Sequence, residues 1–465
     1  MPRAIHRVIE VVTGLAALAL LLWPALVSGY PLIYPDTLDY LGTGRAAWAA
    51  LLHAQHSAFY AVRSPVYAAA IYLFHWNHTP WPILALNAGA VLFTVYLVTR
   101  ALVQRDARRK TLVVLAVVSI VSGLSWYTSL LMPDIFGAPL YLAIYLFAFA
   151  RETLRPVEKI VLAALAIFGA LAHASHLLLA IGLCATLWLV WLMLRGRKSS
   201  SGLTMHSLCV VTSVVMGAIF LQLVVNQRLY GHASLDGERP PFLEAHIIAD
   251  GTGARYLREH CMEHPDWALC HHLDNLSAYE DDFLWDGNGI WAAASEAEQA
   301  QLRREEMPLI LATVHAYPAQ QAAVSLKNFW RQLTDFAIDD GDNNGYMQAH
   351  LSDEIPGASA DYDRSLQVRA AMPQGFFTIV QNVTVVASLV FIAFALPRTL
   401  RRTGIYRDRL LALSGVIFFV VPGNAFISGV LSAVDSRYQA RIVWLIPLLA
   451  MFYLLEFPIF ARPVE

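Results

Sequence analysis

Apolar runs long enough to cross a lipid bilayer recur along this chain of 465 residues. An α-helix needs about 20 consecutive apolar residues to cross the hydrocarbon core, so each run of that length predicts a membrane span. The composition agrees, because 57% of the residues are hydrophobic and only 15% are charged, whereas soluble domains carry about a quarter charged residues. The sequence therefore predicts an all-α polytopic membrane protein.

About ten spans are predicted, and the basic residues in the loops between them set their orientation. Short loops rich in Lys and Arg stay on the cytoplasmic side of a membrane. The basic clusters at 104–110, 151–159, 195–198 and 398–409 then all lie inside, and both termini are cytoplasmic. A cleaved signal peptide is the alternative interpretation of the first run. The expected spans are 11–28, 81–103, 111–130, 135–150, two within 160–194, 207–226, 375–396, 410–429 and 440–458.

The chain divides into three predicted parts. Residues 1–226 form a seven-span module with an outer loop at 29–80, in which the apolar run 65–76 is too short to cross and predicts a helix at the outer interface. Residues 227–373 are polar and form an extracytoplasmic soluble domain between spans seven and eight, and residues 374–465 form a three-span module. The predicted location is a bacterial inner (plasma) membrane. A net charge of −2 gives no argument for a nucleic-acid partner.

Charged residues gather in the predicted outer turns. Asp36 and Asp39 follow the first span, Asp134 lies between spans three and four, and Arg437 and Arg441 lie in the last outer loop. A carboxylate at the membrane surface can act as a general base towards a hydroxyl group. An arginine at the same depth can bind a phosphate through paired hydrogen bonds. The alternative interpretation is that these residues are solvated loop residues or helix caps.

Two further pairs of polar residues have more than one interpretation. His173 and His176 interrupt a long apolar stretch. On one helix they would share a face and could bind a metal or a phosphate, whereas the alternative is a polar turn between two spans. In the outer domain, Cys261 and Cys270 predict a disulfide in an oxidising compartment. Free thiols are an alternative, and so is a zinc site with the neighbouring histidines, although the spacing matches no standard zinc motif.

Several motifs follow one another in a fixed order. Asp36 comes soon after span one, Arg63-Ser-Pro-Val-Tyr67 leads into the short apolar helix, Asp134 lies in a Met-Pro-Asp turn, and the Arg437-Tyr438 pair lies in a late loop. This order resembles the GT-C superfamily of membrane glycosyltransferases. Its members include the protein O-mannosyltransferases and the lipid A aminoarabinose transferases, which use polyprenyl-phosphate-linked sugars. The resemblance covers about residues 8–226, covers the last three spans loosely, and does not extend to the outer domain.

The resemblance implies transfer of a sugar from a polyprenyl-phosphate-linked donor to a lipid, glycan or protein acceptor at the outer face, with inversion. Asp36 would take the acceptor's proton, although the Asp-x-x-Asp spacing leaves Asp39 as an alternative base, and Asp134 would orient the acceptor or help Asp36. No cofactor is required, and a divalent cation is allowed but not indicated. The residues that would bind the donor phosphate are Arg437, Tyr438, Arg63 and Arg441.

Two other classes of protein share this topology. A transporter or flippase for lipid-linked glycans is expected to carry its functional charges near the middle of the bilayer. Here the mid-span positions are almost all apolar and the charges lie towards one face, which favours an enzyme at the interface. A non-catalytic envelope assembly factor is the third interpretation, with residues 227–373 as its partner-binding domain.

Overall fold

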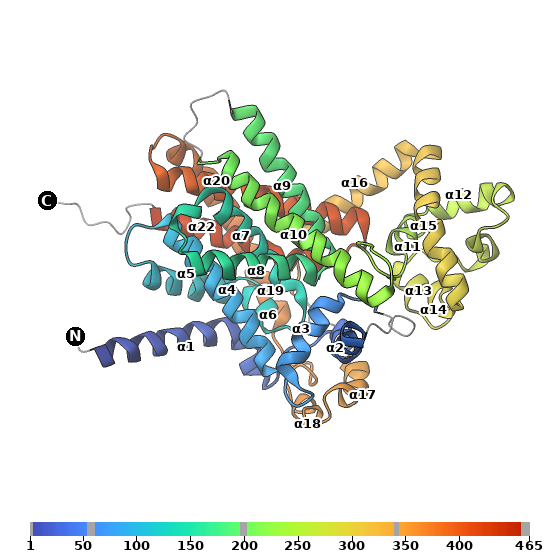
Figure 1. The fold of residues 1–465 in the computed structure, drawn as a ribbon, viewed down its shortest axis with the longest axis horizontal. Coiled ribbons are helices and arrows are strands. Elements are labelled where there is room, and N and C mark those ends of the chain that lie inside the picture. Colours follow the sequence, from blue (N-terminus) through green and yellow to red (C-terminus); the bar gives the residue numbers. More distant parts are fainter. Residues whose placement is uncertain (1–2, 54–60, 196–201, 339–343, 457–465) are drawn as a thin grey trace. The chain divides into compact units, whose positions relative to one another are not determined.

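The computed structural model describes residues 3–53, 61–195, 202–338 and 344–456 (Figure 1). Parts of four predicted segments lie outside these ranges: 54–60 of the outer loop, 196–198 of a basic loop, 339–343 of the outer domain, and 457–458 of the last span. In the described ranges the secondary structure is helical apart from one isolated β-bridge. The predicted fold class is confirmed to this extent: the protein is an all-α membrane protein.

Six helical segments in the described ranges are long and apolar enough to cross a membrane. A helix rises about 1.5 Å per residue, so each is long enough for most or all of a hydrocarbon core about 30 Å thick. The six segments are α4 (Trp81–Leu102), α9 (Ala174–Leu194), α10 (Met205–Tyr230), α19 (Gln374–Leu400), α20 (Ile405–Leu431) and the stretch Ser436–Leu455, which holds α21 (Ser436–Val443) and most of α22 (Leu445–Glu456).

The other predicted spans correspond to helices that are not among these six. They are α1 (Arg3–Ser28), α5 (Ala107–Val121), α7 (Gly137–Phe149) and α8 (Pro156–Ala172). The predicted run 111–130 is divided because Ser122 adopts an extended conformation, and the short helix α6 (Leu124–Ser129) follows it. Helix α8 has 17 residues and ends where His173 is extended, just before α9 begins.

The chain packs as two compact units. The first contains residues 1–237, 336–421 and 440–465, and the second contains 238–335 and 422–439. This division differs from the predicted boundaries at 227 and 373. Residues 336–373, which include α17 (Asn344–Glu354) and α18 (Ser359–Asp363), pack with the first unit, whereas part of the predicted C-terminal module packs with the second.

Helix α7 is almost completely buried in the first unit. Every residue from Gly137 to Ala148 is buried, as expected for a helix that is apolar on all sides. It packs against α4, α8, α9 and α10. Its N-terminus follows directly from the 3₁₀-helix η2 (Pro133–Phe136), so the turn that carries Asp134 is held at one end of a rigid central helix.

Two helices follow α1 and place the first predicted acids. They are α2 (Pro35–His53) and α3 (Pro65–His75), and α3 matches the short helix predicted at 65–76. The two helices cross closely at Gly44, where an added Cβ would lie 2.6 Å from the carbonyl oxygen of Ala68. The indole of Trp48 also donates a hydrogen bond of 2.7 Å to the carbonyl of Ala69. A residue larger than glycine at position 44 would therefore separate α2 from α3.

The second unit is a bundle of shorter helices around its own apolar core, which includes Leu257, Phe283 and Leu309. Its α-helices are α11 (Phe242–Ala249), α12 (Thr252–His260), α13 (Glu280–Leu284), α14 (Ile290–Ala293), α15 (Glu296–Ala316) and α16 (Pro318–Thr334). Three 3₁₀-helices lie between α12 and α13: η4 (Cys261–Glu263), η5 (Ala268–His271) and η6 (Leu273–Asn275). The first unit contains η3 (Arg151–Thr153) as well as η2.

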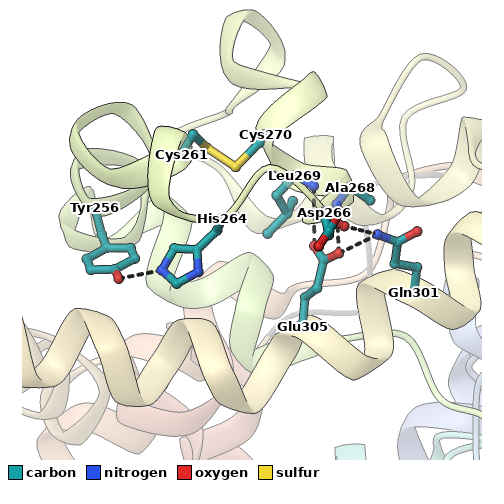
Figure 2. Close-up of a disulfide and its surroundings, with 9 residues drawn as sticks. All are labelled: Tyr256, Cys261, His264, Asp266, Ala268, Leu269, Cys270, Gln301 and Glu305. Atoms are coloured by element: carbon teal, nitrogen blue, oxygen red, sulfur yellow. Dashed lines mark hydrogen bonds between the residues drawn. A yellow bond between two sulfur atoms is a disulfide. The ribbon is translucent and has the colours of Figure 1, made fainter.

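A disulfide joins Cys261 and Cys270, the same two cysteines that the sequence pairs (Figure 2). The disulfide closes the segment between the end of α12 and η5. The Cα atoms of the two cysteines are 5.5 Å apart. Glu305 of α15 accepts a hydrogen bond of 2.7 Å from the backbone amide of Ala268 within this segment. His264 lies beside the disulfide and pairs with the hydroxyl of Tyr256 at 3.0 Å.

Candidate functional site

The first predicted acids form an ion pair with the arginine that precedes α3. Arg63 Nη2 lies 2.7 Å from Asp36 Oδ1, and Arg63 Nε lies 3.7 Å from Asp39 Oδ2. The two acids are three residues apart on α2, so their side chains share a face of the helix. The exposed fractions of the side chains are 14% for Asp36, 19% for Arg63 and 47% for Asp39. The shorter and more buried Asp36–Arg63 pair is therefore the centre of this cluster.

Hydrogen bonds at the first turn of α2 fix the position of Asp36. The hydroxyl of Thr37 accepts a bond of 2.9 Å from the amide of Tyr34 and donates one of 3.2 Å to the carbonyl of Leu131. Pro35 occupies the first helical position, where its missing N–H is not needed. Asp36 thus begins a helix whose N-terminus is tied to the segment before Asp134.

The start of α3 fixes the position of Arg63. The hydroxyl of Ser64 caps α3 by accepting a bond of 3.2 Å from the amide of Tyr67, and it donates one of 2.7 Å to the carbonyl of Leu171 near the end of α8. Tyr67 is completely buried, with its ring in a T-shaped contact 4.9 Å from Tyr40. Its hydroxyl has no hydrogen-bond partner among the described residues.

An unpaired buried hydroxyl costs about 1–3 kcal/mol, so its presence needs a reason. Tyr67 is the last residue of the Arg-x-Pro-x-Tyr motif but was not predicted to act in the site. We count Tyr67 as an additional candidate residue of the site. Its place in that motif was the feature of the sequence that could have identified it.

The second predicted acid forms a completely buried ion pair. Arg441 Nη1 lies 3.1 Å from Asp134 Oδ1, and both side chains are only 1% exposed. Arg441 Nη2 also donates a hydrogen bond of 2.9 Å to the hydroxyl of Ser175. Two charges removed from water stabilise a fold only when their geometry is good and further hydrogen bonds support them. This pair joins η2, the start of α9 and α21, which are far apart in the sequence.

The two predicted histidines lie on either side of the junction between α8 and α9. His173 caps α9, where its Nδ1 accepts a bond of 3.3 Å from the amide of Ser175. His176 is completely buried, and its Nδ1 pairs with the carbonyl of Gly169 at 3.0 Å. A carbonyl only accepts, so Nδ1 of His176 is the donor and carries a proton. An added Cβ at Gly137 would lie 2.8 Å from Nε2 of the same ring.

Backbone pairing brings the two ion pairs into neighbouring turns. Leu32 exchanges hydrogen bonds of 3.0 and 2.9 Å with the residues on either side of Leu130, which makes the isolated parallel bridge. Asp36 lies four residues after Leu32, and Asp134 lies four residues after Leu130. The structure therefore assembles Asp36, Asp39, Arg63, Asp134 and Arg441, together with both histidines, from five separate segments of the first unit.

Arg437 and Tyr438 belong to the second unit, although they share helix α21 with Arg441. The backbone amide of Arg437 donates a bond of 2.8 Å to the side chain of Asp435, and its guanidinium lies 5.2 Å from the centre of the Tyr438 ring. The side-chain amide of Asn424 donates a bond of 2.7 Å to the carbonyl of Tyr438. Arg437 is buried, so its position is fixed by packing as well as by these contacts.

A cavity of about 290 Å³ lies between α2 and α17, next to the Asp36–Arg63 pair. Sequence reasoning did not predict the contribution of α17. The only local signal was the spacing of its polar residues, which recur at helical intervals on one face. The residues that line the cavity are Leu38, Asp39, Gly42, Thr43, Tyr346, His350, Asp353 and Glu354.

Carboxylates make this cavity acidic. Burial raises the pKa of Asp39, Arg63 opposes the shift, and Asp36 adds to it. About half of the Asp39 side chain remains exposed, so solvent limits the size of the effect. Burial also raises the pKa of Glu354, with smaller contributions from Asp353 and Asp39. Asp39 therefore belongs both to the arginine cluster and to the wall of the cavity.

The described residues contain no group of three or more His, Cys, Asp or Glu side chains arranged to hold a metal ion. No family model, curated protein or solved structure matches this chain. What the arrangement can do must therefore be argued from its chemistry. It offers carboxylates able to accept a proton, guanidinium groups able to bind an anion, and a cavity beside them.

Proposed function

We propose that the protein is a membrane glycosyltransferase with a GT-C-like fold of about ten spans. It transfers a sugar from a polyprenyl-phosphate-linked donor to a lipid, glycan or protein acceptor at the outer face of the membrane. The observation that carries this proposal is the pairing of Leu32 with Leu130, which sets the Asp36–Arg63 and Asp134–Arg441 pairs in neighbouring turns. An acid and a cation at one place are what the reaction needs, because it removes a proton and releases a phosphate.

The chemical step is a displacement at the anomeric carbon of the sugar. The acceptor oxygen forms a bond to that carbon while the bond from the carbon to the phosphate oxygen breaks. Asp36 accepts the proton of the acceptor hydroxyl, and polyprenyl phosphate leaves with the bonding electrons. Attack from the side opposite the phosphate inverts the configuration.

The ion pair with Arg63 gives this step a charge balance. Before the reaction, Asp36 neutralises the guanidinium at 2.7 Å. When Asp36 takes the proton, it loses its negative charge, and the guanidinium can turn to the phosphate that is gaining one. Asp39, at 3.7 Å from the same arginine, keeps the guanidinium oriented during the exchange.

A second pair of predicted site residues in the first unit supports this centre. The Asp134–Arg441 pair fixes the turn on which the acceptor is oriented, because both of its members are buried at the start of α7. The family resemblance assigns the donor phosphate to Arg437 and Tyr438, which lie at the start of α21.

The test uses the full chain in liposomes with undecaprenyl-phosphate-linked hexoses or pentoses that carry a radiolabel in the sugar. Asp36→Asn should lower the release of undecaprenyl phosphate by about 10²–10⁴-fold, the usual contribution of a general base. Asp106→Asn, at an exposed carboxylate before α5, is the matched control and should keep full activity. Full activity of Asp36→Asn would refute the assignment. Movement of intact donor across the bilayer without release of phosphate would favour the transporter instead.

A second measurement examines the donor site. Arg437→Ala should raise the KM for the lipid-linked donor more than the KM for the acceptor, because it removes a cation that would bind the phosphate. Arg258→Ala, at an exposed arginine of α12, is the matched control. Equal donor KM values in Arg437→Ala and the parent would contradict the role of Arg437.

A further inference from the structure

Helix α16 is amphipathic in the opposite sense to a helix of a soluble domain. Its buried side chains are polar, namely Asn328 and Gln332. On the exposed side, Leu326 and Trp330 keep 56% and 55% of their surfaces accessible. Surface helices of soluble domains turn apolar residues inward and polar residues outward. The outward face of α16 is therefore better suited to an apolar surface than to water.

Hydrogen bonds of the buried face fix the rotation of α16. Asn328 donates a bond of 2.8 Å and Gln321 one of 3.0 Å to the two carboxylate oxygens of Asp250. Gln332 exchanges two bonds, of 2.8 and 3.0 Å, with the backbone of Asp435. Turning Leu326 or Trp330 inward would break these contacts, so the apolar face stays outward in the folded second unit.

The same helix packs against the end of a membrane span. Gly429 lies in the last turn of α20, and an added Cβ there would lie 2.8 Å from both the carbonyl oxygen of Asn328 and the Cβ of Gln332. Helix α20 is long and apolar enough to cross the bilayer. The part of α16 that carries Leu326 and Trp330 is thus beside the end of a span, where lipid headgroups meet the acyl chains.

The charges on α16 match a lipid surface. Lys327 and Arg331 are both exposed, and each directly follows one of the two apolar residues, Leu326 and Trp330. Tryptophan prefers the membrane–water interface, and long basic side chains can reach from apolar surface to phosphate. We propose that α16 binds the interface of a bilayer that contains anionic lipid. Leu326 and Trp330 enter the acyl boundary, while Lys327 and Arg331 contact lipid phosphates.

A spin label tests the depth of this face. The chain, with free Cys184 and Cys209 replaced by Ala and Ser, is labelled at Leu326→Cys, Trp330→Cys or, as a control, Tyr279→Cys, an exposed aromatic position of the same unit. In liposomes, oxygen should relax the labels on α16 more than a water-soluble nickel complex does, and the reverse should hold at 279. Greater access to nickel at all three positions would overturn the proposal. So would dipolar broadening that disappears on dilution with unlabelled chain, because it would identify a second copy on this face.

The charges are tested by varying the lipid. In vesicles of phosphatidylcholine with phosphatidylglycerol, Lys327→Glu/Arg331→Glu should lower the immersion of the label at 326, by roughly fivefold in partition for each positive charge removed. Arg258→Glu/Arg304→Glu makes the same change at two exposed arginines elsewhere in the unit and should leave the label immersed. The contact with anionic lipid would be refuted if the label at 326 were equally immersed in both double variants. It would also be refuted if the immersion of this label, without either double substitution, did not depend on phosphatidylglycerol.

Discussion

Removing one member of the Asp134–Arg441 pair is expected to destabilise the protein more than removing both. The two side chains are 3.1 Å apart and only 1% exposed. Asp134→Leu, Asp134→Asn or Arg441→Met leaves the opposite charge buried without this ion-pair partner. Breaking a buried pair in this way costs about 3–5 kcal/mol, mainly because the remaining charge has lost its hydration.

The double variant Asp134→Leu/Arg441→Met should lie within about 2 kcal/mol of the parent protein. Replacing both charges by apolar groups removes the attraction between them, but it also removes the free-energy cost of taking each charge out of water. The double-mutant cycle of Asp134→Leu and Arg441→Met should therefore give a coupling energy of at least about 4 kcal/mol. Ser175→Ala removes only the additional hydrogen bond to Arg441 and should cost about 1 kcal/mol.

Unfolding of the full chain in mixed micelles, titrated with sodium dodecyl sulfate and followed by far-UV circular dichroism, measures these free energies. The matched control is the exposed pair of Arg255 and Glu259, whose atoms are 2.8 Å apart. Glu259→Gln should give no measurable change, because water already solvates both of these charges.

Two results would refute the reasoning on Asp134 and Arg441. If the free energy of unfolding falls in the double variant by the sum of its decreases in the two single variants, the two charges do not interact in the folded protein. If Asp134→Asn keeps the stability of the parent, the carboxylate is not buried beside the guanidinium. A stable Asp134→Asn that has lost sugar transfer would instead show that this acid acts in the reaction.

Three further changes test other parts of the fold, the first and third by the same unfolding titration and the second by proteolysis. Gly137→Ala places a methyl group 2.8 Å from His176 Nε2, so it should cost about 1–3 kcal/mol, and an unchanged midpoint would contradict the close contact. Cys261→Ser/Cys270→Ser opens a link with a sequence separation of 9. It should lower the free energy of unfolding of the second unit by roughly 2–3 kcal/mol, which makes that unit more sensitive to protease. Equal protease resistance would count against the disulfide. Burial, reinforced by neighbouring glutamates, raises the pKa of Glu244 above its usual value of 4.5. The folded state then keeps a proton that the unfolded chain releases, so stability should fall as the pH rises from about 4.5 through the raised pKa. Glu244→Gln should flatten this dependence, and identical pH profiles would contradict the prediction.

Local patterns in the sequence were enough to predict the class of protein and several helices. The apolar run 65–76 corresponds to α3, and the interruption at His173 is the junction of α8 and α9. These features depend on residues close together in the chain, where apolar length and helix breaks are directly readable. The division of the run 111–130 was missed, because the extended Ser122 lies among residues that are apolar or small on both sides.

Contacts between distant segments could not be read in this way. Asp134 and Arg441 are 307 positions apart, and nothing near either residue specifies its partner. The bridge between Leu32 and Leu130 is a backbone contact, so side-chain patterns carry no trace of it. The same holds for helix α16, where Asn328 and Gln332 pair with Asp250 and Asp435 instead of facing water. Such pairings follow from the three-dimensional packing, which determines which polar side chains find a partner.

The proposed reaction gives the Asp36–Arg63 pair a property that neither residue has alone. In the resting site the pair is neutral, so it attracts the donor phosphate weakly. Partial burial of a neutral pair also has a smaller desolvation cost than partial burial of a single charge. Proton transfer to Asp36 makes the pair cationic at the moment when the phosphate is leaving, which stabilises the transition state more than the bound donor. Asp36→Asn should therefore have two opposite effects. It should lower kcat because the base is lost, and it should also lower the Kd for the donor because Arg63 has lost the nearer of its two carboxylate partners. Donor binding measured by isothermal titration in nanodiscs separates the two. A donor Kd in Asp36→Asn equal to or higher than that of the parent would show that the arginine does not exchange its partner during the reaction.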